Sequence, residues 1–215
     1  MPALMLEGCA LHWILNRPPG ESEDAVYATV VRGGRHFATS SECAQCRRKV
    51  LEEQVRPLLL ELFAPRLSGF VWTDSADIVI EESSAAKLDT TGLRGIAWEK
   101  VEVEAWWRPD LPSPEIVNWL DRGMAPPLRM LHATARAGAL APPGRHDAIC
   151  RGCGRVQESV LKTGFSVDPA TWDGSDILYV DEFPAIPVIS ERFVQVLQAS
   201  GIRNYSIIPT EEFIA

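Results

Sequence analysis

Apolar positions recur with two different periods in the first third of the chain, and each period predicts a different element. Residues 25–39, AVYATVVRGGRHFAT, hold two short runs of β-branched and aromatic residues around Gly33 and Gly34, which predicts a tight β-hairpin. From Lys49 to Phe63 the apolar residues recur every three or four positions, as in an amphipathic helix. Pro57 interrupts this stretch, so we expect a kink or two consecutive short helices.

A second pattern is an internal repeat. Residues 80–102 align without gaps with residues 189–211, and six positions are identical: Ile80/Ile189, Glu82/Glu191, Leu88/Leu197, Gly92/Gly201, Arg94/Arg203 and Glu102/Glu211. Each copy is typical of a strand end, a short helix, a glycine that closes the helix, and a second strand. In the second copy Ser190 is a suitable N-cap for a helix with a buried apolar stripe. Duplication and convergence on a common local design both explain the match.

These units predict the fold class. With 46% hydrophobic and 23% charged residues, the chain has the composition of an ordinary globular protein. We expect a single domain spanning residues 1–215, of α+β class, in which a mostly antiparallel sheet is flanked by short helices.

Charge and targeting features restrict the function. The formal net charge of −8 repels a phosphate backbone, so a nucleic-acid partner is disfavoured. No apolar stretch reaches the ~18 residues of a membrane span, and the N-terminus lacks the basic start of a secretory signal, which favours the cytoplasm. No G-x-S-x-G, P-loop or G-x-G-x-x-G motif is present, so the sequence predicts neither an enzyme nor a small-molecule substrate.

Four of the five cysteines form two C-x-x-C pairs, Cys43 with Cys46 and Cys150 with Cys153. Two such turns supply the four soft ligands of a closed tetrahedral site for structural Zn²⁺. Because the pairs are far apart in the sequence, a shared metal would pin an early segment of the chain to a late one. The basic run from Arg47 to Lys49 would then help to keep the nearby thiolates ionised.

Several other interpretations of the cysteines remain open. Each pair could form its own disulfide, although a reducing cytosol disfavours this, or the cysteines could be small core residues. A catalytic zinc would need an open coordination position, and no H-E-x-x-H motif accompanies the pairs. His36 and His146 lie close enough in sequence to replace a thiolate or to contact one. The remaining cysteine, Cys9, is expected to be a buried thiol.

The motifs together resemble a known family. The segments CRGCGR (150–155), DGSDI (173–177) and ISERF (189–193), followed by Gly201, resemble the myxobacterial double-CxxCG motif family. The ending E-R-F-x-x-x-L-x-x-x-G is also similar to that of toxin-immunity proteins of contact-dependent swarming-inhibition type. The resemblance implies an immunity protein that binds and neutralises a cognate polymorphic toxin, encoded nearby, in the cytoplasm.

One position departs from the family pattern. Arg47 follows the first cysteine pair where the family has glycine. Glycine eases a turn with positive φ, so the first turn is expected to be strained or differently shaped.

An acidic segment near the C-terminus is the candidate surface for the toxin. Aromatic residues with a charged rim suit a tight interface, and acidic groups attract a basic cleft. The candidate toxin-binding residues are Asp168, Trp172, Asp173, Asp176, Asp181 and Glu182. The alternative is a solvated acidic loop with Trp172 packed into the core. The alternative function is a zinc-stabilised nucleic-acid-binding or regulatory interaction module.

Overall fold

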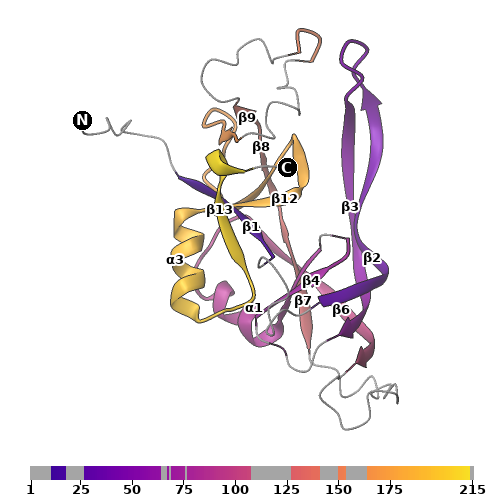
Figure 1. Ribbon diagram of the computed structural model, residues 1–215, viewed down its shortest axis with the longest axis vertical. Helices are drawn as coiled ribbons and strands as arrows, with labels where there is room; N and C mark the ends of the chain where they lie inside the picture. Colours follow the sequence, from indigo (N-terminus) through magenta and orange to yellow (C-terminus); the bar gives the residue numbers. More distant parts are fainter. Residues whose placement is uncertain are drawn as a thin grey trace, which may run out of the picture.

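A computed structural model describes residues 11–17, 27–63, 67, 69–75, 77–107, 127–140, 150–153 and 164–213. Strands dominate these residues, and two short helices lie side by side along one flank (Figure 1). Among the described residues, no helix has the length and apolar character needed to cross a bilayer.

Six strands close into a barrel. Their order around it is β2 (Tyr27–Glu42), β3 (Lys49–Phe63), β6 (Ile96–Trp107), β7 (Leu128–Ala133), β5 (Ile78–Glu81) and β4 (Phe70–Thr73). Alternate residues Leu58, Leu60 and Leu62 of β3 are buried and pack with Val79 and Met130 in one cluster. The barrel therefore has an apolar interior built on the period-2 side-chain pattern of strands.

Beside the barrel lies a five-stranded sheet. Its order is β13 (Ser206–Pro209), β1 (His12–Asn16), β12 (Phe183–Ser190), β11 (Ile177–Val180) and β8 (Ala135–Ala137), and a separate pair joins β9 (Ala139–Leu140) to β10 (Ser166–Val167). A short 3-10 helix, η3 (Thr210–Glu212), follows β13. The strand-rich fold with flanking helices is confirmed. The expected mostly antiparallel sheet is wrong, because the molecule has a closed barrel and mixed sheets in which β2–β4, β3–β6 and β8–β11 are parallel pairs.

The predicted hairpin at Gly33 and Gly34 and the predicted helix from Lys49 to Phe63 are both wrong. β2 runs through the two glycines and pairs with β3 along nearly its whole length, from Tyr27 opposite Phe63 to Glu42 opposite Lys49. Leucines at 58, 60 and 62 satisfy a period of 2, and the neighbouring apolar residues also satisfy a period near 3.6, so periodicity alone could not decide. Pairing with β2 and β6 stabilises the strand.

The glycine pair serves a bulge and not a turn. Gly33 has φ 84° and faces Pro57, where a Cβ atom would lie 1.9 Å from the Pro57 carbonyl oxygen. The strand register shifts between Arg32 and Gly34 at this place. Pro57 lacks an N–H group, and a bulge is one of the few positions in a sheet that tolerates this.

Both repeat copies have the predicted order of strand, helix and strand, but only the second helix ends at its predicted glycine, Gly201, because the first is capped by Thr90, two residues before Gly92. The first is β5, α1 (Glu82–Asp89) and β6, and the second is β12, α3 (Glu191–Ser200) and β13. The side chain of Ser190 accepts the N–H of Phe193, which confirms the predicted N-cap. The buried residues Ser84, Ala85 and Leu88 of α1 align with the buried Phe193, Val194 and Leu197 of α3.

Each copy also binds, through the carbonyl of its aligned arginine, a residue next to or in the strand that pairs with the other copy. The Arg94 carbonyl of the first copy accepts the N–H of Asp176 at 2.9 Å, just before β11, while the aligned Arg203 carbonyl accepts the N–H of Phe70 at 3.1 Å, at the start of β4. Strands β11 and β4 are the partners of β12 and β5 respectively. The two units therefore pack as a pseudo-symmetric pair.

Candidate metal centre

The first cysteine pair lies at the end of a long two-stranded extension. β3 pairs with β6 from Leu58 onward and β2 pairs with β4 at Tyr27 and Ala28. Residues 35–56, which we call the ribbon, extend from these contacts, as Figure 1 shows. Because two-stranded ribbons are marginally stable alone, the end of this ribbon needs an additional anchor.

Residues 43–48, the first knuckle, join the two strands of the ribbon. The N–H of Cys43 donates to the Arg48 carbonyl and the N–H of Arg47 donates to the Cys43 carbonyl, both at 2.9 Å. Arg47 has φ 61°, the left-handed conformation that favours glycine. The first turn is therefore strained at Arg47, as predicted from the absence of a glycine at this position.

Residues 150–153, the second knuckle, close onto the first. Gly152 faces Gln45, and a Cβ atom there would lie 2.9 Å from the Gln45 Oε1 and 3.4 Å from the Cys43 sulfur. The absence of a side chain at Gly152 therefore lets the two knuckles approach each other.

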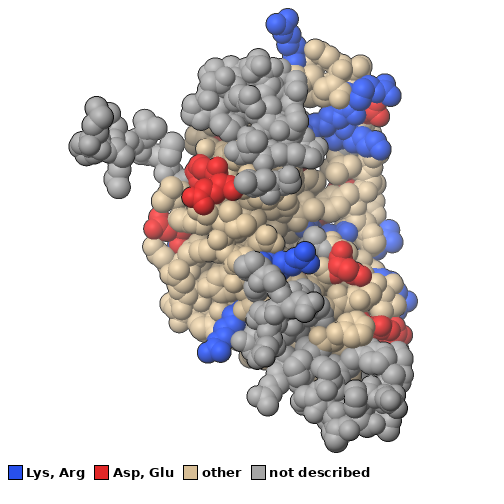
Figure 2. Space-filling view, in the orientation of Figure 1, with Lys and Arg blue, Asp and Glu red and all other residues tan. Residues whose placement is uncertain are grey.

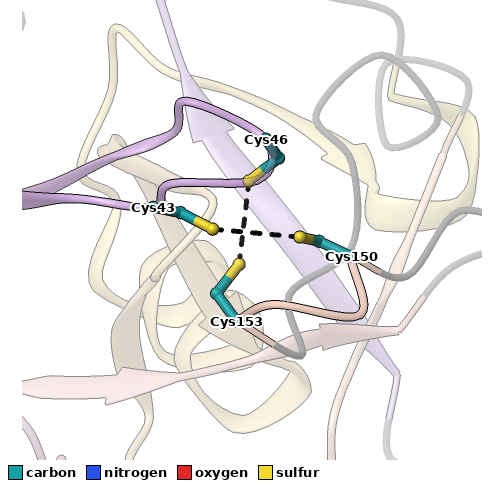
Figure 3. A group of neighbouring side chains, drawn as sticks. All are labelled: Cys43, Cys46, Cys150 and Cys153. Atoms are coloured by element: carbon teal, nitrogen blue, oxygen red, sulfur yellow. Dashed lines mark hydrogen bonds between the residues drawn. The ribbon is translucent and has the colours of Figure 1, made fainter.

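The four sulfurs converge between the knuckles (Figure 3). The Cys43 and Cys150 sulfurs are 3.9 Å apart, the Cys46 and Cys153 sulfurs are 3.8 Å apart, and all four lie within 4.8 Å of one another. A tetrahedral ion with metal–sulfur bonds of ~2.3 Å separates its ligands by ~3.8 Å. These cysteines are free thiols, and their spacing matches the ligand set of one ion.

Backbone N–H groups favour the ionised form of two of the four thiols. The N–H groups of Cys46 and Gln45 lower the pKa of the Cys43 thiol to about 6, and the N–H groups of Cys153 and Gly152 lower the pKa of Cys150. Each knuckle thus stabilises one thiolate in the same way.

The crowded sulfurs oppose further ionisation. The Arg48 N–H lowers the pKa of Cys46, but desolvation and the other three cysteine side chains outweigh it and raise this pKa to about 11. A divalent cation reverses this balance by neutralising the thiolates, so binding releases protons.

The cysteine cluster is a closed ligand set. Four sulfurs fill a tetrahedron and leave no position for a substrate or a reactive water, which suits a structural ion. Within the part of the chain that the structure describes, these four cysteines are the group able to hold an ion, and exposed His36 is not among them. His146 and Cys9 lie outside the described residues.

A polar clasp fixes the base of the ribbon to the five-stranded sheet. The buried Arg35 side chain stacks 3.7 Å from the Tyr179 ring centre and donates to Glu53 and to the Pro184 carbonyl. Arg136 donates to the same Glu53 at 2.7 Å. This clasp could not be predicted from the sequence, because the partners of Arg35 come from distant segments that only the fold brings together.

The candidate toxin-binding residues are not equally accessible. Asp176 is buried and accepts hydrogen bonds from the Arg94 N–H at 2.8 Å, the Ser190 hydroxyl at 2.9 Å and the Arg192 guanidinium at 2.9 Å. Its carboxylate thereby connects the two repeat copies, which is a structural role that sequence reasoning missed.

Glu182 is also directed into the fold. Its carboxylate accepts the Ala139 N–H at 3.0 Å, and burial raises its pKa. Its carbonyl accepts Arg48 at 3.3 Å, which links the first knuckle to the five-stranded sheet.

The remaining four residues of the candidate patch lie nearer the surface. Asp173 is exposed, whereas Asp168, Trp172 and Asp181 are half-buried. The Trp172 ring packs edge-on against His12, with ring centres 4.8 Å apart, and its indole N–H donates to the Ser175 carbonyl. A toxin contact at this surface stays a prediction, and the residues available to it are these four.

Comparison with known proteins found no matching family model and no matching curated protein.

Proposed function

We propose that the chain is a non-enzymatic immunity protein that binds and neutralises a cognate toxin, with a structural Zn²⁺ held by Cys43, Cys46, Cys150 and Cys153. The observation that carries the proposal is the closed cluster of four sulfurs at the end of the ribbon. Such a set uses its ion to hold chain segments together and offers no reactive position. The binding function is therefore expected to reside outside the metal site, on the surface of the fold.

The identity of the ion is testable directly. Tetrahedral sites with four sulfurs suit zinc and also iron, and elemental analysis distinguishes the two. We expect about one zinc per chain, and a Cys150→Ser variant should lose it. Cys9→Ser is the matched control, because the proposal assigns the ion to the other four cysteines, and the zinc content should therefore stay unchanged.

The antidote activity is supported by the resemblance of the motifs and by the charge. A net charge of −8 steers the chain toward a basic surface, and toxins that attack nucleic acids present such surfaces. Exposed Asp173, beside half-buried Trp172, supplies a charged rim next to an aromatic anchor.

Co-expression with the product of the adjacent gene tests this function. We expect a 1:1 complex that survives purification and rescue of cells that produce the neighbouring protein. Asp173→Ala should weaken the complex, while Lys100→Ala, an exposed charge on β6, serves as the control. A harmless neighbouring protein that does not bind would end the antidote proposal.

One observation favours the alternative, a nucleic-acid-binding module. Exposed basic residues gather at the end of the ribbon, where Figure 2 shows Lys and Arg concentrated. Arg47, Lys49 and Arg151 are exposed there, and the Arg47 side chain is 79% accessible. Binding to mixed DNA or RNA that falls steeply with added salt would support this alternative over the antidote.

A further inference from the structure

The four cysteines of the cluster differ in their exposure to solvent. Cys150 is 5% exposed and Cys43 is half-buried. Cys46 and Cys153 are exposed, they come from different knuckles, and their sulfurs are 3.8 Å apart (Figure 3). A soluble oxidant therefore reaches an outer pair whose two members belong to opposite sides of the site.

We propose that Cys46 and Cys153 form a redox modification site, at which a peroxide converts the metal-bound tether into a disulfide between the two knuckles. The inference rests on the proposed zinc site only for the starting state, because the sulfur geometry is independent of the ion. Its consequence is that the end of the ribbon stays attached to the second knuckle after the ion leaves.

The chemistry balances with hydrogen peroxide as the oxidant. One exposed thiolate attacks the peroxide, the O–O bond breaks, and a sulfenic acid and hydroxide form. The second exposed thiol attacks the sulfenic sulfur, the S–O bond breaks and water leaves as the disulfide forms. The two sulfurs together lose two electrons, which reduce one peroxide to the level of water. The ion then has two thiolate ligands instead of four and is released.

A cross-link between the knuckles differs from one within a knuckle. Cys46 and Cys153 are 107 positions apart in the sequence, so their disulfide closes a long loop and compacts the denatured chain. A disulfide between Cys43 and Cys46 encloses two residues and leaves the denatured chain extended. Cys43 and Cys150 are the less accessible members of each knuckle, which disfavours this second product.

The experiment treats the purified full chain with graded hydrogen peroxide and blocks the remaining thiols with an alkylating agent. We expect a faster-migrating band on a non-reducing denaturing gel, a Cys46–Cys153 peptide by mass spectrometry, and metal release in parallel with the loss of about two thiols per chain. Dithiothreitol with added zinc should reverse all three changes.

Variants sharpen the test. Cys46→Ser and Cys153→Ser should each abolish the fast band, whereas Cys43→Ser keeps the outer pair and should retain it. Disulfides confined to single knuckles in the wild-type chain, or sulfinic acids without a cross-link, overturn the proposal. If the chain carries no metal but still forms the Cys46–Cys153 disulfide, the zinc proposal fails and this inference stands.

Discussion

The strained backbone at a single residue, Arg47, can be tested by substitution. Arg47 adopts φ 61°, a conformation that costs a residue with a side chain about 1 kcal/mol relative to glycine. Arg47→Gly should therefore raise the free energy of unfolding of the metal-loaded protein by about 1 kcal/mol, measured by urea denaturation. Arg47→Ala removes the same ion pair with Glu42 but keeps the strained backbone. Equal effects of the two variants would show that the backbone is not the cause.

Asp176, a candidate toxin-binding residue in the sequence, has a structural role that substitution can test. Its buried carboxylate accepts hydrogen bonds from both repeat copies, and its removal leaves these donors without a partner. We expect Asp176→Ala to lower the free energy of unfolding by about 3 kcal/mol. Asp173→Ala, at an exposed position of the same segment, should cost less than about 1 kcal/mol. A small effect of Asp176→Ala would contradict its role as a connector.

Asp77 gives the fold a dependence on pH. Desolvation raises the pKa of this fully buried carboxyl, although Ser75 and the Arg35 N–H partly oppose the effect. A raised pKa means that the folded state favours the protonated form. The stabilisation is therefore complete below the pKa of ~3.9 in the unfolded chain and is lost as the pH rises through the raised value.

Asp77→Asn should remove the loss of folding stability that accompanies rising pH. Urea unfolding of both proteins from pH 4 to pH 8 measures the free energy of unfolding, and the variant should gain stability relative to the wild type as the pH rises. Both chains carry the same cysteine cluster, so the difference between them isolates Asp77. Parallel pH curves would exclude this residue as the source.

At the scale of elements, the sequence predicted those that local signals define. The N-cap at Ser190, the stripe of Phe193, Val194 and Leu197, and the C-cap at Gly201 all act within a few residues, and both strand–helix–strand units are present. The cysteine cluster was predicted for a similar reason, since each C-x-x-C pair constrains its own knuckle.

Elements whose form depends on distant partners were predicted wrongly or missed. The segment Lys49–Phe63 has no local feature that separates a strand from a helix, and β2 and β6 decide the outcome. The clasp of Arg35 with Glu53 and Tyr179 joins residues from three separate strands. Such contacts follow from topology, which periodicity does not encode.

The ribbon should depend on the ion more than any other element does. Its strands lack a barrel partner between residues 35 and 56 among the described pairings, so the knuckles and the clasp anchor it. After metal removal by a chelator, amide hydrogen exchange at residues 38–42 and 49–53 should accelerate by about tenfold or more. Amides of Leu58 to Leu62, inside the barrel, should be nearly unaffected. Uniform acceleration through the barrel would show that the ion supports the whole fold directly.

At the scale of the whole molecule, the proposed ion connects parts of the chain that are distant in the sequence. Cys43 and Cys150 are 107 positions apart, as are Cys46 and Cys153. A cross-link over a loop of about 100 residues restricts the unfolded chain by up to about 4.7 kcal/mol in the chain-entropy account. Because the ion binds the folded cluster far better than the unfolded chain, its binding free energy adds to folding stability.

Thermal unfolding should therefore depend on the free metal concentration. We expect the midpoint to rise with added zinc and to fall in a chelator, and Cys150→Ser should unfold near the chelated midpoint with no response to zinc. Cys9→Ser should keep the full response, because this variant retains all four proposed ligands.

The peroxide-treated chain provides the decisive comparison. If a disulfide between Cys46 and Cys153 restores most of the lost midpoint without metal, loop closure is the main contribution of the ion; if it restores little, the geometry that four ligands impose on the knuckles is the larger one.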